Sequence, residues 1–259
     1  MKLLLGLLIF AILAYAGAAV LLFTMQERFL FPAPPGDVPA PPPGFERVTI
    51  KSGTERLPAY WHPPEPGETT VVRFHGNGDA IGFQRPIGEA LAAADFGVLL
   101  AEYRGYPGAT GSPSEAGLFA DGEAAFDFAR ERTDGSVALY AHSLGAAVAV
   151  HVATVRNVSR LVLEAPFESM RSEVARRVSW LPVDRLLRHP FRTDERLERV
   201  KAPTLVIHGG RDGVIDSRSG ERVAKRLGAP FVLLKDAGHN DLWSHGALER
   251  AVAFLRERR

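Results

Sequence analysis

One serine in the chain lies in a setting that could make it a nucleophile. The segment AHSLG, residues 141–145, follows the short apolar run 137–140 and precedes a longer run rich in alanine and valine. A nucleophile elbow turns sharply from a strand into a helix, so it needs small residues two positions before and two positions after the serine. Ala141 and Gly145 meet that need. We therefore predict that Ser143 is a nucleophile, the alternative being a serine that only caps the helix.

A serine hydroxyl attacks efficiently when a base accepts its proton, and histidine often serves as that base. The chain has eight histidines. His239 comes after the last apolar run and before the last helical run, which places it at the carboxyl edge of a predicted sheet. We predict that His239 is the general base, with His245 as the second candidate. Three others are interpreted as packed or loop side chains, namely His62, His151 and His189.

The base needs an acid that orients its ring. Asp212 follows the apolar run 204–207 through a short loop that contains two glycines. The carboxyl end of a strand is where the acid of such a site is expected. Asp216, a little further along the chain, and Glu164, directly after the run 161–163, are the rival candidates. We predict that Asp212 is the acid.

The transition state of acyl transfer carries an oxyanion, which backbone N–H groups can bind. Leu144, directly after Ser143, would supply one such group. The segment FHGNG, residues 74–78, follows an early apolar run, and we expect the main-chain N–H of Asn77 to supply the other. The same letters also fit an ordinary glycine turn. This chemistry needs neither a metal nor a cofactor.

Short apolar runs alternate with longer amphipathic runs over the rest of the chain. This alternation predicts an α/β fold with a mostly parallel sheet and helices on both of its faces. Strands are expected at residues 47–50, 57–61, 70–74, 98–101, 137–140, 161–163, 204–207 and 231–234. Helices are expected at residues 115–130, 144–154, 218–227 and 247–256.

The amino-terminal segment is apolar enough to enter a membrane. Residues 3–23 contain no charged side chain, and a helix of that length spans about 30 Å, which matches the hydrocarbon core of a bilayer. We predict a single-pass transmembrane anchor over residues 1–25. A cleaved signal peptide is the alternative, because Ala14 and Ala16 have the spacing of a cleavage site. An anchor with its amino terminus inside would hold the catalytic domain outside the cytoplasm.

The anchor is followed by a proline-rich stretch and then by one domain. Residues 32–44 hold seven prolines, which predicts an extended linker over residues 26–44. The catalytic domain then takes residues 45–259, a size that one α/β domain of about 200–250 residues accommodates.

Composition excludes several classes of function. The formal net charge of +1 provides no basic surface for nucleic acid, which we do not expect as a partner. The absence of cysteine excludes disulfides, cysteine-ligated metals and cysteine hydrolases. The apolar fraction of 46% and the charged fraction of 24% are typical of a globular protein.

Taken together, these segments resemble the α/β-hydrolase superfamily, and within it the membrane-anchored hydrolase-domain proteins that include protein depalmitoylases. The likeness covers nearly the whole chain. Besides the anchor and the segments above, it is carried by RFLFP (28–32), YRGY (103–106), PSE (113–115) and EAPF (164–167). The resemblance implies an α/β-hydrolase fold with an eight-stranded sheet, and the chain order serine, aspartate, histidine is that of the superfamily.

The resemblance also implies a substrate class. Residues 167–200 occupy the place of the family's lid and are few, which implies an open site and a small-molecule or lipid-borne acyl substrate. The loop 107–111 is longer than in relatives, which changes one wall of the site. We predict a serine hydrolase that cleaves carboxylic esters or thioesters through an acyl-enzyme. The alternatives are a peptidase or amidase that uses the same residues and a catalytically silent, membrane-tethered binding protein. A haloalkane dehalogenase is disfavoured, because its nucleophile is an aspartate.

Overall fold

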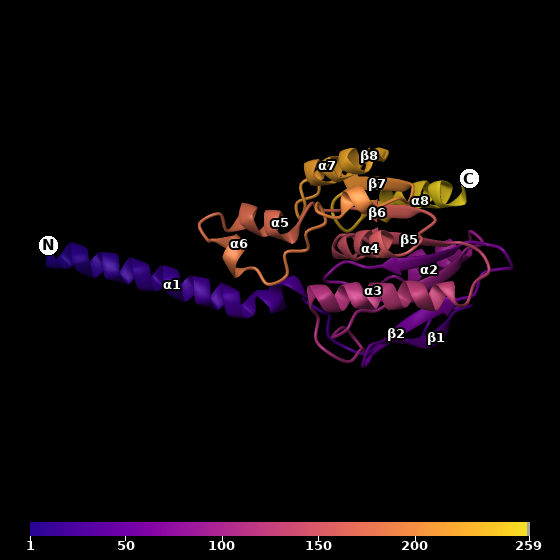
Figure 1. Ribbon diagram of the computed structural model, residues 1–259, viewed down its shortest axis with the longest axis horizontal. Coiled ribbons are helices and arrows are strands. Elements are labelled where there is room, and N and C mark those ends of the chain that lie inside the picture. The colour runs from indigo at the N-terminus through magenta and orange to yellow at the C-terminus, as the bar shows by residue number, and fades with distance from the viewer. Residues whose placement is uncertain (258–259) are drawn as a thin grey trace.

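The body of the protein is built around an eight-stranded sheet (Figure 1). The structure is a computed structural model that describes residues 1–257. The strands lie across the sheet in the order β1-β2-β4-β3-β5-β6-β7-β8, and only the pairs β1–β2 and β2–β4 are antiparallel. They are β1 (Glu46–Ser52), β2 (Glu55–His62), β3 (Thr70–Phe74), β4 (Gly97–Ala101), β5 (Val137–His142), β6 (Leu161–Glu164), β7 (Thr204–Gly209) and β8 (Phe231–Leu234). The predicted eight strands and the mostly parallel sheet are confirmed.

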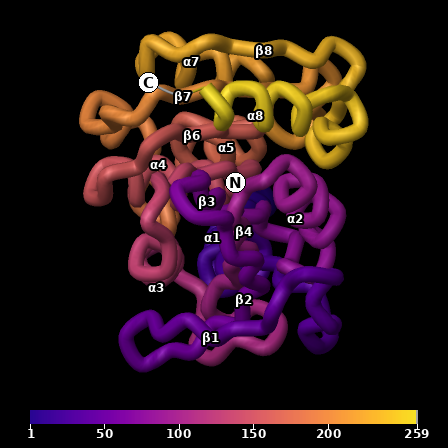
Figure 2. The backbone as a smooth tube through the Cα atoms, turned by 90° about the vertical axis from the view of Figure 1, so that its right-hand side faces the viewer, coloured from indigo at the N-terminus to yellow at the C-terminus, as the bar shows by residue number. Residues whose placement is uncertain are grey.

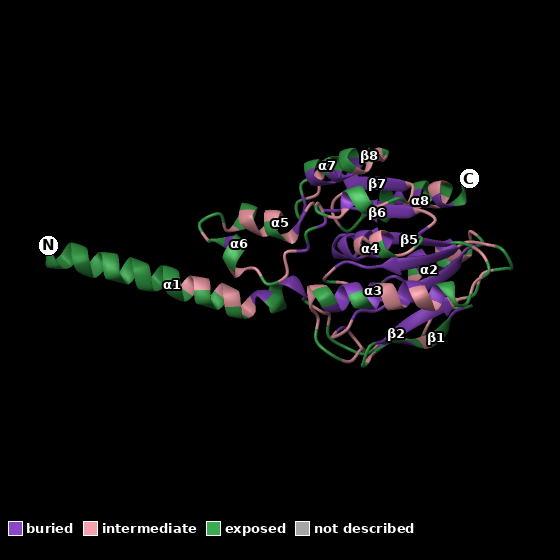
Figure 3. Cartoon of the chain, in the orientation of Figure 1, coloured by how far each residue is buried: buried purple, intermediate pink, exposed green. Residues whose placement is uncertain are grey.

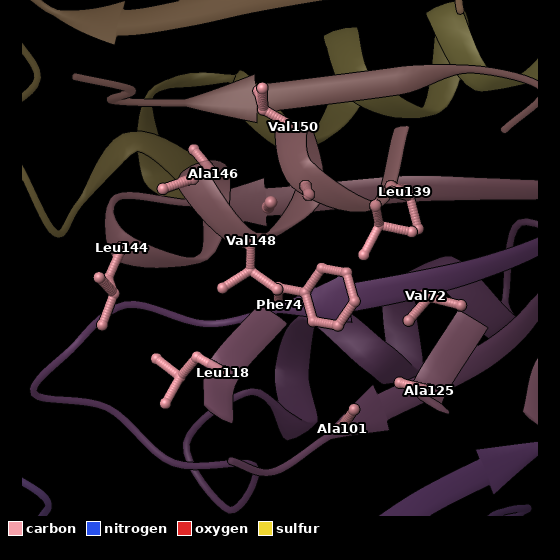
Figure 4. Close-up of a cluster of buried hydrophobic side chains, with 14 of the residues drawn as sticks. Val72, Phe74, Ala101, Leu118, Ala125, Leu139, Leu144, Ala146, Val148 and Val150 are labelled. Atoms are coloured by element: carbon pink, nitrogen blue, oxygen red, sulfur yellow. The ribbon is translucent and has the colours of Figure 1, made fainter. Parts of the chain in front are cut away.

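Helices cover both faces of the sheet. Every residue of β3 and of β4 is buried, as expected for strands that are covered on both sides. On β3, Phe74 packs into one buried cluster with Leu118 and Val148 (Figure 4). Val71 packs into the other. The first cluster lies under α3 (Glu115–Arg130), α4 (Leu144–Val155) and α7 (Ser217–Leu227), and the second under α2 (Arg85–Ala92) and α8 (Ala247–Arg256) (Figure 2).

The region 167–200, expected in the place of a lid, contains two short helices that were not predicted. They are α5 (Met170–Arg177) and α6 (Val183–Leu186), and a 3-10 turn, η1 (Leu197–Arg199), follows. Ser169 caps α5, because its side chain accepts a hydrogen bond from the N–H of Ser172 at 3.1 Å. The region projects beyond the sheet and lies alongside the first helix of the chain (Figure 1).

That first helix, α1 (Lys2–Leu30), extends away from the body (Figure 1). Its first half is exposed on all sides (Figure 3). By length and composition it could cross a membrane, although a signal sequence has the same properties. It continues past the predicted anchor end at residue 25, and Leu30 and Phe31 are buried in the core.

The proline-rich segment after α1 lies on the body instead of standing off as an extended tether. The Nη2 group of Arg47 donates a hydrogen bond to the carbonyl oxygen of Val38 at 2.8 Å. The hydroxyl of Tyr60 donates to the carbonyl oxygen of Pro39 at 2.6 Å. Side chains of β1 and β2 thus satisfy carbonyl groups that a proline-rich chain leaves without ladder partners. The helix α1 is therefore joined to the body over a short, packed distance.

Candidate active site

Ser143 is the single residue between β5 and α4. Its backbone angles, φ 53° and ψ −116°, lie where residues other than glycine are strained, as at a sharp strand-to-helix turn. A Cβ atom at Gly145 would collide with the carbonyl oxygen of Phe74, so the close approach of the two backbones requires glycine there. Ala141 is fully buried on the strand side. The local structure has the shape expected of a nucleophile elbow.

The structure brings His239 and Asp212 into line with Ser143. The Nε2 atom of His239 is 3.0 Å from Oγ of Ser143, and its Nδ1 atom is 2.7 Å from Oδ2 of Asp212. An ionised carboxylate can only accept a hydrogen bond, so Nδ1 carries the proton and Nε2 remains free to accept one from the serine hydroxyl. This geometry allows the histidine to act as a general base toward the serine.

Asp212 is held in place by three further contacts. Its Oδ1 atom accepts hydrogen bonds from the N–H groups of Val214 and Ile215, both at 2.8 Å. Its Oδ2 atom also lies 3.2 Å from Nε2 of His208, and both side chains are fully buried. Burial alone would raise the pKa of Asp212, but the hydrogen bonds from His208 and His239 hold this pKa well below its usual range. Asp212 is therefore ionised at neutral pH.

Two histidines that the sequence reasoning missed support this arrangement. Nε2 of His208 lies 3.1 Å from the carbonyl oxygen of Ile215, so Nε2 is the protonated atom that faces Asp212. Nε2 of His142 donates to the carbonyl oxygen of His239 at 2.9 Å. Burial, followed by the nearby His239, lowers the pKa of His142 to about 3, so this ring is neutral. His142 ends β5 directly before Ser143, and His208 lies near the end of β7, four residues before Asp212. These positions were the available signal.

The loop after β3 lies beside the serine. A Cβ atom built on Gly76 would be 3.5 Å from the Cβ of Ser143. The carbonyl oxygen of Asn77 accepts a hydrogen bond from the hydroxyl of Tyr106 at 2.7 Å, and its side-chain Nδ2 faces the carbonyl oxygen of Leu30 at 3.4 Å. The side chain of Asn77 is thus turned toward α1. Any contribution of Asn77 to an oxyanion would come from its main chain, as predicted.

The two predicted oxyanion donors have a physical basis in this structure. Leu144 is the first residue of α4, where N–H groups have no partner inside the helix. The loop that carries Asn77 is held by the buried His75, which donates from Nδ1 to the carbonyl oxygen of Gly76 at 2.8 Å and from Nε2 to Glu102 at 2.7 Å. Although burial alone would lower the pKa of His75, the charge of Glu102 and its hydrogen bond raise it.

Ser143 and His239 open into a cleft of about 400 Å³, a size typical of small-molecule sites. Exposed aromatic side chains, Phe83 and Trp243, form part of its walls. Its remaining lining is Arg73, Gly76, Asn77, Gly78, Asp79, Gln84, Pro86, Ile87, His142, Glu164, Val214, Asn240 and Leu242. Among residues 1–257, none from the region 167–200 belongs to this lining. That region therefore does not cover the cleft.

The rival acids lie apart from His239. Glu164 accepts hydrogen bonds from Nη2 of Arg73 at 3.0 Å and from the hydroxyl of Tyr140 at 2.5 Å, so its carboxylate faces a buried arginine. Asp216 accepts from the N–H of Arg218 at 3.0 Å and caps α7. Each carboxylate thus has a structural partner of its own.

The other histidine candidates also have separate partners. Nε2 of His245 lies 3.6 Å from Asp241, and Nε2 of His151 lies 2.9 Å from Glu123. His62 and His189 lie near the linker and α1, where they contact Gly44 and Phe31. Within residues 1–257, no three His, Asp or Glu side chains are grouped so that they could hold a metal ion.

Sequence comparison relates the chain to known proteins over most of its length. Residues 65–188 match the family described as serine aminopeptidase, S33. An uncharacterized protein of Mycobacterium tuberculosis is 34% identical over 244 residues, which are 89% of this chain and 87% of the relative. The α/β-hydrolase domain-containing protein aho-3 of Caenorhabditis elegans is 32% identical over 81% of this chain and 64% of its own length. Protein bem46 of Schizosaccharomyces pombe is 28% identical, covering 80% and 79% of the two chains.

Solved structures share the fold. An esterase of Pyrococcus furiosus superposes with a TM-score of 0.72 at 18% identity, over 86% of this chain and 97% of the esterase. The thioesterase domain from the curacin biosynthetic pathway superposes with a TM-score of 0.62 at 14% identity, over 82% of this chain and 99% of that domain.

Proposed function

The chain belongs to the α/β-hydrolase superfamily, and from this membership we propose that it is a serine hydrolase that cleaves carboxylic ester or thioester bonds. One observation carries the proposal. Ser143 Oγ, both ring nitrogens of His239 and the Asp212 carboxylate form a continuous row of hydrogen bonds, 3.0 Å and 2.7 Å long. An ordinary helix cap would not need a histidine and a buried acid behind the serine.

In the proposed reaction, Oγ of Ser143 attacks the carbonyl carbon while Nε2 of His239 takes the hydroxyl proton. Asp212 holds the ring and stabilises the imidazolium. The N–H groups of Leu144 and Asn77 donate to the oxyanion of the tetrahedral intermediate. The bond to the alcohol or thiol then breaks, the leaving group takes the proton from His239, and the acyl group stays on Ser143. Water, deprotonated by His239, attacks this ester and releases the acid.

The open cleft supports small or lipid-borne acyl substrates over large enclosed ones. Phe83 and Trp243 are 67% and 52% exposed, and they offer apolar surface near Ser143 for an acyl chain. The solved neighbours include an esterase and a thioesterase domain, which is consistent with either bond. The matched family is described as an aminopeptidase, so amide cleavage by the same residues is the second candidate.

We also propose that α1 anchors the enzyme in a membrane. Support comes from its apolar length and from its contacts with the body, since Glu27 pairs with Arg188 at 2.9 Å. An orientation with Lys2 in the cytoplasm places the catalytic body outside it. Protease treatment of intact cells tests this topology, because only a body outside the cytoplasm would be digested.

A fluorophosphonate probe tests the catalytic proposal directly, because it reacts with activated serines. The full-length protein should be labelled, Ser143→Ala should not be, and the exposed Ser112→Ala should be labelled like the unchanged protein. Failure of the folded protein to react would favour a catalytically silent binding protein. For a reactive protein, rates on matched p-nitrophenyl esters, thioesters and aminoacyl amides would then identify the bond that is cleaved.

A further inference from the structure

A groove of about 290 Å³, distinct from the catalytic cleft, separates α1 from the region 167–200. One wall is a single face of α1 that runs from Ala19 to Leu30. Apolar side chains of α5, of α6 and of the turn between them, such as Val174, Leu186 and Leu181, form the other. The α5–α6 segment lies along the carboxyl-terminal half of α1 (Figures 1 and 3). The region that does not cover the active site thus forms a second, apolar site together with α1.

The polar side chains that line this groove are Gln26 and Arg177, and both already have protein partners. Oε1 of Gln26 accepts from the N–H of Arg188 at 2.8 Å, and its Nε2 donates to the carbonyl oxygen of Leu186 at 3.1 Å. Arg177 donates to the carbonyl oxygen of Glu173 at 3.0 Å. Because the rest of the lining is apolar and both polar side chains are engaged by the protein, the groove suits an apolar occupant.

Trp180, at the tip between α5 and α6, reaches back along α1. It is 50% exposed, its carbonyl oxygen accepts a hydrogen bond from the hydroxyl of Tyr15 at 3.2 Å, and the two rings meet edge to face at 5.7 Å. Tyr15 precedes Phe23, the end of the apolar stretch 3–23, by eight residues, or about 12 Å of helix at about 1.5 Å per residue. If that stretch fills the hydrocarbon core, which is about 30 Å thick, the tip reaches well inside the near leaflet.

Charged side chains gather beside the end of the apolar stretch of α1. The guanidinium of Arg188 lies 4.3 Å from the ring centre of Phe23 and 2.9 Å from a carboxylate oxygen of Glu27. An arginine at the end of an apolar span is positioned to meet lipid phosphates. The groove begins on the lipid-tail side of these charges, at Ala19 and Leu22, and extends past them to Phe29 and Leu30.

We propose that this groove holds an acyl chain of a membrane lipid and that the Trp180 tip is inserted into the same leaflet. The inference rests on the proposed membrane anchoring by α1. The argument is that one wall of the groove is the helix α1. If α1 is embedded in lipid, the groove opens directly into the acyl chains around it. Leu30 also joins the two sites, since it lines the groove and accepts a hydrogen bond from Asn77, which lines the cleft. The enzyme would therefore keep a lipid chain beside its proposed oxyanion loop.

Tryptophan fluorescence of the full-length protein in phosphatidylcholine vesicles tests the insertion. Lipids with bromine on the middle of the acyl chain should quench part of the emission. This part should be lost in Trp180→Phe and kept in Trp243→Phe, which removes the exposed tryptophan of the cleft. Protein that floats with the vesicles but whose Trp180 emission is not quenched would overturn the inference alone. Protein that does not float with them would overturn the anchor proposal as well.

A lipid with a photoactivatable group in its acyl chain tests the groove itself. It should label the groove residues Val174, Leu186 and Leu187 in the unchanged protein. Ala19→Phe, which fills the groove, should abolish labelling of these residues while labelling of the inserted Trp180 tip remains. Ala14→Phe, which places the same ring about 140° around the helix, should leave labelling of the groove intact. Unchanged labelling in Ala19→Phe, or capture of a second copy of the chain, would refute lipid occupancy. Circular dichroism of each variant reports its fold, and hydrolysis of a soluble ester tests the catalytic proposal independently.

Discussion

Replacement of Asp212 by asparagine is a sharp test of the proposed acid, because the surrounding hydrogen bonds determine which way the amide must point. Oδ1 of Asp212 accepts from two backbone N–H groups, those of Val214 and Ile215, both at 2.8 Å. The asparagine would keep its carbonyl oxygen there, since an NH₂ group would face two donors. Its NH₂ group must then take the place of Oδ2, which is 2.7 Å from Nδ1 of His239.

A donor in that place reverses the tautomer of the histidine. Nδ1 of His239 would become the acceptor, and the proton would sit on Nε2, which faces Ser143 and could no longer accept the hydroxyl proton. We expect kcat to fall about 10⁴-fold, as for a triad with the wrong tautomer. At about 1.36 kcal/mol per tenfold, the loss corresponds to about 5.4 kcal/mol of transition-state stabilisation. The side chain keeps its volume, so the fold should survive.

Steady-state hydrolysis of p-nitrophenyl acetate measures kcat, and circular dichroism checks the fold. Asp216→Asn is the matched control and should keep nearly full activity, because Asp216 caps α7 and does not contact His239. Glu164→Gln leaves the buried Arg73 without its counter-ion and should cost about 3–5 kcal/mol of stability. The activity of this variant is therefore compared only under conditions in which circular dichroism shows that it is folded. The wrong tautomer predicts a loss of about 10⁴-fold. If folded Asp212→Asn keeps more than about a tenth of the activity, this reasoning is refuted. A larger loss in either rival would move the acid to that residue.

Three further predictions follow from the same contacts. His208→Ala should lower kcat about tenfold to hundredfold in the p-nitrophenyl acetate assay, because a hydrogen bond to a charged group contributes about 1.5–3 kcal/mol. His208→Gln, which keeps an N–H donor, should lose less. Deletion of residues 1–17, which are all exposed, should leave hydrolysis of that soluble ester unchanged and slow only the cleavage of a membrane-inserted thioester. Loss of both activities in a folded protein would contradict a purely tethering role. The raised pKa of His75 favours its protonated form in the folded state, so its stabilisation is complete below about pH 6.5 and is lost as pH rises through the folded-state value. Urea unfolding at about pH 6 and pH 9 should show this decrease in the free energy of unfolding, and His75→Gln should show a smaller one.

Much of the fold could be predicted because its signals are local. Most strands of the sheet are short runs rich in apolar residues, and β3 and β5 are buried along nearly their whole length because both of their faces are covered. The turn at Ser143 could be recognised from Ala141 and Gly145, since the backbone contact that requires small residues is made within a few residues of the serine or against the neighbouring strand. The short helices α5 and α6 were not anticipated. Helices of so few residues carry little periodicity, and their position depends on contacts with α1.

The sequence by itself determined the alternation of elements, the apolar length of α1 and the small set of serine, histidine and acidic residues at strand ends. Only the tertiary structure decided which of Asp212, Asp216 and Glu164 lies against His239, because that depends on how loops from separate strands meet above one edge of the sheet. It also placed His208 behind the acid and the proline-rich segment on the body. The serine and the histidine are 96 positions apart in the chain, and a distance of 3.0 Å between them is set by strand order and register, which hydrophobic periodicity does not specify.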